Sequence, residues 1–266
     1  MTEWSLTAEQ QAVVEHPLVP VRIAAGAGTG KTSTIVARLV RFVEEGLEPE
    51  AALGITFTNK AAEELSDRLR TSLPGHAIEG REVEVTTYHG FAFSLLQEYG
   101  AFVGVERDIE VIGPGYVRQL ILEALPGRTY RHLDMTFPPA RVDEVATLAG
   151  QLGDNLATPA DLRALETVQS GPVWDARREL AEIVTAYDAR KRGLGVVDYS
   201  DLIRLAHHLI NEHPSVAAKI RDRYRVVLLD EYQDTAPAQR ELLRGVFGDG
   251  FPVTAVGDAD QTIYEW

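Results

Sequence analysis

The stretch AGAGTGKT, residues 25–32, decides the fold class of this chain. It follows a short apolar run, PVRIAA at 20–25, and it precedes residues 31–45, where apolar residues recur at helical spacing. A glycine-rich turn between a strand and a helix directs backbone N–H groups and the helix N-terminus at one point, which favours an anion. The stretch therefore predicts a phosphate-binding loop at the end of a strand in a parallel α/β sheet.

The residues of this loop have separate expected roles. Lys31 would reach the β and γ phosphates of ATP, and the hydroxyl of Thr32 would bind Mg²⁺. The strict pattern has glycine where this chain has Ala25, but the glycines that follow still let the backbone approach a phosphate. The alternative is an ordinary glycine-rich turn. The loop residues expected to bind ATP are Ala25, Gly26, Ala27, Gly28, Thr29, Gly30, Lys31 and Thr32.

A second stretch, VVLLDEYQDT at 226–235, places two carboxylates directly after an apolar strand. In a parallel sheet, such a strand end lies at the same edge as a phosphate loop. Asp230 would hold Mg²⁺, and Glu231 would orient and deprotonate the attacking water. Two adjacent carboxylates with separate roles indicate hydrolysis rather than binding alone. The alternative, a solvated acidic loop, is disfavoured by the phosphate loop elsewhere in the chain.

The order of the predicted elements indicates one domain inserted into another. Strands are predicted at 53–58, 82–87, 224–230 and 251–258, and helices at 6–15, 60–72, 91–99 and 236–247. Between them, residues 105–190 carry only helical patterns with Pro and Gly between them. We therefore predict an α/β fold: a RecA-like parallel sheet formed by 1–104 and 191–266, with an α-helical domain, 105–190, inserted. The charged stretches at 176–179 and 189–192 favour a solvated helix face over the alternative, contact with a nucleic-acid backbone.

The composition is that of a globular protein, with 45% hydrophobic and 25% charged residues. No cysteine is present, which excludes disulfides and thiolate metal sites. The sequence has no membrane-length apolar run and no secretory leader, so we expect a cytoplasmic protein without a membrane partner. The net charge of −14 predicts weak, salt-sensitive binding to nucleic acid, although one groove can still be basic.

With both motifs established, the chain resembles superfamily 1 DNA helicases of the UvrD, Rep and PcrA type. Five further stretches resemble motifs of that family in order along the chain, which makes chance agreement implausible. They are LTAEQQAVV at 6–14, FTNKAAEEL at 57–65, TTYHGFAFSLL at 86–96, VDYSDLIRLA at 197–206 and VGDADQTIYEW at 256–266. The resemblance implies ATP-driven 3′→5′ translocation on single-stranded DNA and unwinding at duplex junctions.

The resemblance also implies roles for further residues. Gln10 would recognise the adenine, although the family usually has Asn or Asp where Thr7 stands, and Gln261 would sense the γ-phosphate as part of the catalytic set. The residues expected to contact DNA are Thr58, Asn59, Lys60, His89, Tyr264 and Trp266. For His89, a place in the protein core is an equal alternative.

The family's pattern continues beyond residue 266 into a second motor domain, which supplies arginines to the γ-phosphate. We therefore expect this chain to bind ATP weakly, to hydrolyse it poorly and not to unwind DNA alone. The missing domain would come from the same chain or from a partner. Two alternatives remain: a non-catalytic, nucleotide-gated module, and the motor half of a helicase–nuclease complex.

Overall fold

The computed structural model describes residues 6–26, 28–75, 80–125, 130–165 and 171–258. The chain divides into two compact units. The first comprises the residues up to Ser94, Ile210–Thr235 and the residues from Gln239 onwards, and the second comprises Leu95–Leu209 with Ala236–Ala238. Each unit is described separately below.

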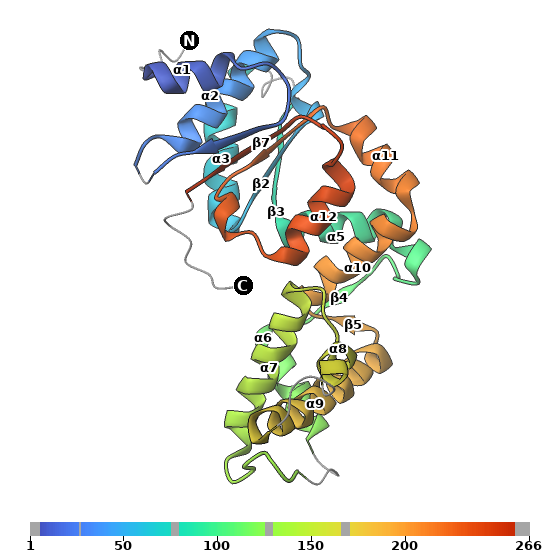
Figure 1. The fold of residues 1–266 in the computed structure, drawn as a ribbon. Helices are drawn as coiled ribbons and strands as arrows, with labels where there is room; N and C mark the ends of the chain where they lie inside the picture. Colours follow the sequence, from blue (N-terminus) through green and yellow to red (C-terminus); the bar gives the residue numbers. More distant parts are fainter. Residues whose placement is uncertain (1–5, 27, 76–79, 126–129, 166–170, 259–266) are drawn as a thin grey trace. The chain divides into compact units, whose positions relative to one another are not determined.

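A five-stranded sheet forms the centre of the first unit, and every pairing in it is parallel (Figure 1). The spatial order is β1-β7-β6-β2-β3. The strands are β1 (Val21–Ala24), β2 (Ala52–Thr56), β3 (Glu84–Thr87), β6 (Val226–Leu229) and β7 (Val253–Gly257). All residues of β2 and β6 are buried, as expected for central strands of a parallel sheet covered on both faces.

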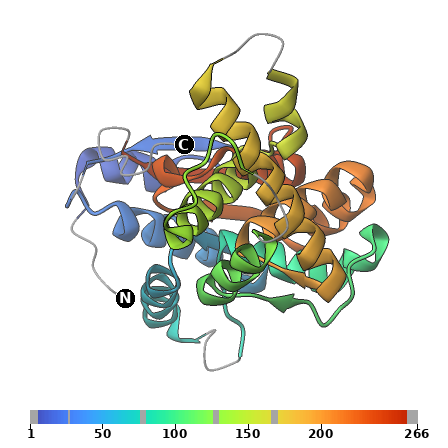
Figure 2. The same ribbon diagram turned by 90° about the horizontal axis from the view of Figure 1, so that it is seen from below.

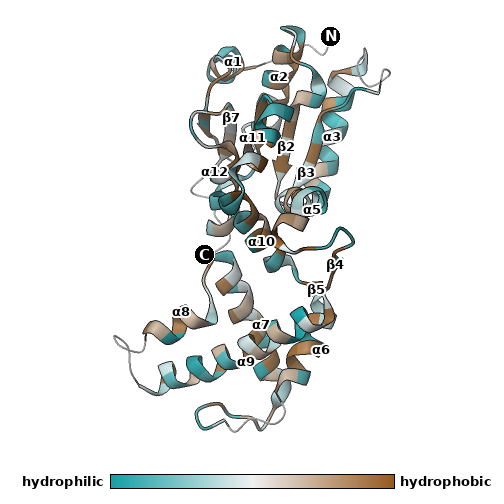
Figure 3. Cartoon of the chain, turned by 90° about the vertical axis from the view of Figure 1, so that its right-hand side faces the viewer, coloured by the Kyte–Doolittle hydropathy of each residue, from teal (hydrophilic) through white to brown (hydrophobic). Residues whose placement is uncertain are grey.

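Two helices cover one face of this sheet. Ile35 and Leu39 of α2 (Lys31–Glu44) and Leu65 of α3 (Asn59–Ser72) pack in one core with Val226 and Leu228 of β6. In Figure 3, β2 is coloured as hydrophobic, whereas α3 carries hydrophilic residues on its exposed side. The apolar spacing in the sequence thus selects the helix faces that cover the sheet.

The opposite face of the sheet borders α12 (Pro237–Phe247). Alternation along a strand points Val227 and Leu229 away from the core that contains Val226 and Leu228. Together with Leu243 of α12, these side chains line an open groove of about 720 Å³. The remaining elements with residues in the first unit are α1 (Ala8–Glu15), η1 (Pro49–Ala51), the start of α5 (Tyr88–Tyr99), the end of α10 (Tyr199–Glu212), α11 (Pro214–Arg223) and η4 (Tyr232–Asp234).

The second unit is built mainly from helices, which Figure 2 shows in green to orange. Its hydrophobic core includes Ile121, Val145, Ile183 and Tyr187, which come from three helices that pack on one another. Its elements are the end of α5, η2 (Gly100–Val103), β4 (Glu110–Val111), α6 (Pro114–Ala124), α7 (Pro138–Asp154), α8 (Pro159–Ala164), α9 (Pro172–Leu194), β5 (Val196–Val197) and most of α10.

The predicted strands and helices of the parallel sheet are confirmed, with small differences at their ends. The helix predicted at 91–99 begins earlier, at Tyr88, so that His89 lies in its first turn. The purely helical pattern predicted for 105–190 needs one correction, because β4 pairs in parallel with β5. Each of these strands has two residues, which is too short to give a periodic pattern.

The solvated helix face predicted for 189–192 is wrong at Lys191. Its side chain is only 6% exposed, and its ammonium lies 2.6 Å from Asp201, 2.7 Å from Asp198 and 3.2 Å from Asp188. Tyr187 also donates to Asp198, at 2.7 Å. A buried ammonium requires such partners, and the partners come from sequence positions that the charge pattern of one helix does not show.

Candidate functional site

The loop after β1 has the backbone shape that a phosphate cradle requires. Gly28 and Gly30 have φ angles of 72° and 80°, which favour glycine, and α2 begins directly afterwards at Lys31. The hydroxyl of Thr29 donates to the carbonyl of Gly26 at 2.8 Å and closes the loop on itself. The free N–H groups of a helix start are an anion-binding element, and this one opens at the carboxyl end of β1.

The acidic pair lies at the same edge of the sheet. Asp230 and Glu231 follow β6, and both β6 and β1 are neighbours of β7. Asp230 is buried, and its backbone N–H donates to the carbonyl of Ile55 on β2 at 3.1 Å. Glu231 has a φ of 48°, an uncommon backbone conformation for a residue with a Cβ.

Two contacts join the phosphate loop to this pair. The ammonium of Lys31 donates to Glu231 Oε2 at 2.8 Å, and the hydroxyl of Thr32 donates to Asp230 Oδ2 at 3.2 Å. The structure therefore brings together four of the residues that the sequence analysis singled out for phosphate, metal and water.

The two carboxylates differ in acidity because their surroundings differ. Burial, and then the charge of Glu231, raise the pKa of Asp230 above its ordinary value, against the opposing effect of Thr32 and Lys31. Burial also favours the neutral form of Glu231, but hydrogen bonds from Gln233 and Lys31 outweigh it and lower the pKa of Glu231. Glu231 is thus ionised at neutral pH and has the protonation state that a general base needs.

Thr32 and Asp230 also fit a magnesium ion. Their side-chain oxygens converge to 3.2 Å, and hydroxyl and carboxylate oxygens are the ligands that Mg²⁺ prefers. Mg²⁺ takes few protein ligands and completes its shell with water and phosphate oxygens. Two oxygen donors beside a phosphate loop are therefore a sufficient protein contribution.

Gln10 lies against the phosphate loop. It forms a reciprocal capping box with Thr7 at the start of α1. The amide nitrogen of the same side chain, Nε2, donates to the carbonyl of Thr29 at 2.7 Å. The structure therefore places Gln10 at the phosphate loop, and recognition of the adenine by Gln10 stays a prediction.

Arg38, which the sequence analysis missed, fixes α1 in place. Its side chain is fully buried and donates to the carbonyls of Val13, His16 and Pro17 at 2.6 to 2.7 Å, and to the hydroxyl of Thr254 at 3.2 Å. Burial and the charge of Arg41 lower its pKa to about 10, so it stays protonated at neutral pH. A charged residue within a strongly apolar helical stretch was the available signal.

Gln233 is the second residue that the sequence analysis missed. Its amide donates to Glu231 Oε2 at 2.7 Å, and its carbonyl accepts from the backbone N–H of Asp258 at 3.0 Å. The side chain thus spans the ends of β6 and β7. Its place in the DEYQDT stretch was the only signal.

Four of the residues expected to contact DNA lie in the described part of the chain. Thr58 caps α3 by accepting from the N–H of Ala61, and Asn59 and Lys60 are exposed in its first turn. His89 is partly buried in the first turn of α5, and burial lowers its pKa. Because β2 pairs with β3, both helix starts lie at the carboxyl edge of the sheet.

The remaining predicted site residues, Ala27, Gln261, Tyr264 and Trp266, lie outside the described residues.

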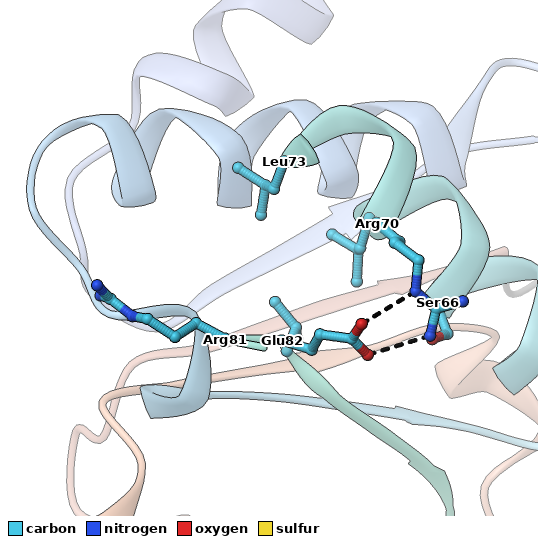
Figure 4. A pocket seen from close by; sticks show the side chains of 7 residues that line it. Ser66, Arg70, Leu73, Arg81 and Glu82 are labelled. Carbon is cyan, nitrogen blue, oxygen red and sulfur yellow. Dashed lines mark hydrogen bonds and ion pairs between the residues drawn. The ribbon is translucent and has the colours of Figure 1, made fainter. Parts of the chain in front are cut away.

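A small cavity elsewhere in the first unit does not compete with this site. It lies between α3 and β3, where Arg70 makes two hydrogen bonds with Glu82 beside Leu73 and Arg81 (Figure 4). Its volume of about 10 Å³ accommodates at most one water molecule.

No helix in the described ranges has the length and apolar character needed to span a membrane.

The chain is similar to known proteins over most of its length. Residues 6–266 match the family model of the UvrD/REP helicase N-terminal domain. The chain is 33% identical to ATP-dependent DNA helicase UvrD2 of Mycobacterium tuberculosis H37Rv, over 97% of this chain and 37% of that protein. It is 30% identical to ATP-dependent DNA helicase PcrA of Leuconostoc citreum, over 97% of this chain and 33% of that protein. For ATP-dependent DNA helicase Rep of Escherichia coli K12, the identity is 28%, over 97% of this chain and 36% of that protein.

The chain thus spans about a third of the length of the curated relatives that it matches. The family match covers the phosphate loop, the acidic pair and the helical unit alike. The chain belongs to the UvrD/REP helicase N-terminal domain family.

Proposed function

We propose that this chain is the ATP-binding and ATP-hydrolysing module of a DNA helicase. The observation that carries the proposal is the convergence of Lys31 and Thr32 on Glu231 and Asp230 at one edge of the sheet. A pure phosphate-binding turn would not require a second strand end with two carboxylates of opposite pKa shift.

The phosphate groups would bind over the loop at 25–32. Backbone N–H groups at the start of α2 would donate to them, and the ammonium of Lys31 would contact the β and γ phosphates. The phosphate oxygens would compete with Glu231 for that ammonium. Thr32 and Asp230 would hold Mg²⁺, which stabilises the negative charge on the phosphates when bound.

Glu231 would act as the general base towards water. Its lowered pKa keeps it ionised, and its carboxylate lies beside the residue that contacts the γ-phosphate. We assign recognition of the adenine to Gln10 and sensing of the γ-phosphate to Gln261. These assignments rest on the position of Gln10 at the loop and on the resemblance of VGDADQTIYEW to the family's motif.

Single-stranded DNA would cross the carboxyl edge of the sheet. Thr58, Asn59 and Lys60 present short polar groups and a cation at a helix start, a suitable arrangement for a phosphate backbone. The side chain of Lys60 is 85% exposed, and its contact with Glu64 is long, at 3.8 Å. His89 at the neighbouring helix start, and Tyr264 and Trp266, would complete the surface.

We further propose that the complete protein moves 3′→5′ on single-stranded DNA and unwinds duplex junctions with a second motor domain. Within it, 1–104 and 191–266 would form the ATP-binding domain and 105–190 the inserted helical domain. Alone, this chain would bind nucleotide weakly and turn it over slowly.

The test is ATP hydrolysis by the chain with Mg²⁺, with and without single-stranded DNA, beside Lys31→Ala. We expect a low rate that the substitution abolishes and that DNA increases. Saturable, Lys31-dependent binding without turnover would instead indicate a nucleotide-gated module. Nucleotide binding that does not depend on Lys31 would contradict the assignment of the site.

A further inference from the structure

Gln233 connects the two strand ends that carry the chemistry of the proposed site. Its side-chain amide donates to Glu231 Oε2 at 2.7 Å and lies 3.3 Å from Asp234 Oδ2. Its side-chain carbonyl accepts the backbone N–H of Asp258, the residue after β7, at 3.0 Å. One carboxamide therefore bonds to the proposed base at one end and to the next strand of the sheet at the other.

The orientation of Glu231 depends on such contacts. Its backbone has a φ of 48°, so the chain around it is held in a conformation that a residue with a Cβ seldom adopts. Gln233 and Lys31 both donate to the same oxygen, Oε2. Among the described residues, none donates a side-chain hydrogen bond to Oε1. The two donors thus fix one carboxylate oxygen and leave the other available for a proton.

The end of β7 is shaped to admit the Gln233 side chain. A Cβ added to Gly257 would lie 2.6 Å from Gln233 Oε1 and 3.1 Å from its backbone nitrogen. The φ angle of Gly257 is in the ordinary range, so its backbone does not require glycine. A Cβ at this position would therefore have to displace the Gln233 side chain.

We propose that Gln233 is a positioning residue that sets the orientation of Glu231 according to the position of the end of β7. A displacement of this strand end moves the side-chain carbonyl of Gln233, which accepts from Asp258. The amide nitrogen of the same group moves with it and shifts the hydrogen bond to Glu231 Oε2. The segment after β7 is the one that carries Gln261. Gln233 thereby couples the end of β7 to the proposed base. This inference rests on the proposed ATP hydrolysis.

The alternative is that Gln233 only stabilises the turn after β6. The two roles separate because the side chain has a donor end and an acceptor end. Gln233→Glu keeps the shape and the acceptor for Asp258, but it loses the donor and places a carboxylate against Glu231. Gln233→Ala removes both ends. A turn-stabilising role requires only the acceptor, whereas positioning of the base requires the donor.

The experiment is steady-state ATP hydrolysis with Mg²⁺ by the 266-residue chain and its variants, with hydrogen exchange at the Asp258 amide as a second readout. We expect Gln233→Glu and Gln233→Ala to lower kcat by about 10- to 100-fold and to change KM for ATP by less than about threefold. Exchange at Asp258 should accelerate in Gln233→Ala and stay slow in Gln233→Glu. Gln119→Ala, which removes an exposed glutamine in the second unit, should match the wild type.

Gly257→Ala adds an independent measurement, because its Cβ would displace the Gln233 carbonyl. We expect Gly257→Ala to lower kcat in the wild-type background. In the Gln233→Ala background, the same substitution should lower kcat much less.

A Gln233→Glu variant with a kcat within about twofold of the wild type would overturn the inference, as would a loss confined to KM. A wild-type chain without Lys31-dependent turnover would overturn the proposed hydrolysis itself, and the inference with it. The Lys31→Ala control distinguishes these two failures.

Discussion

The ammonium of Lys31 lies 2.8 Å from Glu231, although 200 positions of the chain separate the two residues. The contact exists because β1 and β6 both pair with β7, so their carboxyl ends open at one edge. The second unit, inserted between the two halves of the sheet in sequence, does not prevent this convergence. The proposed chemistry therefore depends on sheet order rather than on sequence proximity.

Gly30→Ala should destabilise the chain and weaken nucleotide binding. The φ of 80° is unfavourable for alanine, and its Cβ would lie 3.0 Å from Gln10 Nε2. We expect a loss of about 1–2 kcal/mol in the free energy of unfolding, measured in urea. The matched control is Gly150→Ala in α7, whose Cβ would meet nothing within 4 Å. That helical substitution should stabilise by about 0.5–1 kcal/mol, and equal effects at both positions would contradict the account.

Arg38→Met should weaken nucleotide binding from a distance. The substitution removes the charged donor to the carbonyls of Val13, His16 and Pro17 and loosens the C-terminal end of α1. Gln10 lies in the first turn of the same helix. We expect the free energy of unfolding to fall by about 3 kcal/mol or more, and the Kd for ATP to rise at temperatures where the variant is still folded. Arg22→Met, at an exposed position of β1, is the control. An unchanged Kd in folded Arg38→Met would show that α1 does not contribute to the site.

Magnesium-dependent nucleotide binding should weaken on mild acidification because of Asp230. Protons and Mg²⁺ compete for this carboxylate, and its pKa is raised, mainly by burial. The competition therefore begins at a higher pH than for an ordinary aspartate. We expect affinity, measured by titration between about pH 8 and about pH 5, to fall as the pH decreases.

The control for this pH dependence is the amide variant. Asp230→Asn should bind weakly at every pH and lose the acid-dependent component, whereas Asp67→Asn, at an exposed position, should retain it. An identical pH profile for Asp230→Asn and the wild type would rule out Asp230 as the titrating group.

Lys191→Met should destabilise the chain by about 3–5 kcal/mol near neutral pH, because three aspartates lose their buried cation. These aspartates raise the pKa of Lys191 despite its burial, so the wild-type stabilisation is complete below its ordinary pKa and is lost only as the pH rises through the raised value. Lys191 in turn lowers the pKa of Asp201, whose contribution is lost as the pH falls through that lowered value.

The deficit of Lys191→Met should therefore shrink in acid, where protonation relieves the unpaired carboxylates. Denaturant unfolding at neutral and acidic pH measures it, with Lys219→Met at an exposed position as the control. A deficit of similar size at both pH values would contradict this explanation.

Much of the fold was predictable because the phosphate loop and the apolar strands are local patterns. Glycine at Gly28 and Gly30, the apolar run at 226–229 and the helical spacing of 31–45 are each readable within a few residues. The meeting of Asp230 with Thr32 was also predictable, since the carboxyl ends of parallel strands share one edge.

The contacts that hold the site together were not predictable from local pattern. Arg38 stands out as a charged residue in an apolar helical stretch, but its carbonyl partners lie 21 to 25 positions away in the chain. The bond from Asp258 to Gln233 spans 25 positions, and nothing in either stretch indicates the other. The prediction of a solvated face was wrong at Lys191 for the same reason. The burial of Lys191 depends on Asp198 and Asp201, which belong to later parts of the chain.

We propose above that the loop at 25–32 and the end of β6 form one nucleotide site. The most direct test is equilibrium binding of ATP with Mg²⁺ to the wild-type chain, to Lys31→Ala and to Lys219→Ala. We expect saturable binding that weakens by at least about tenfold in Lys31→Ala and is unchanged in Lys219→Ala. Equal affinity of Lys31→Ala and the wild type, or no saturable binding by the wild type, would contradict it.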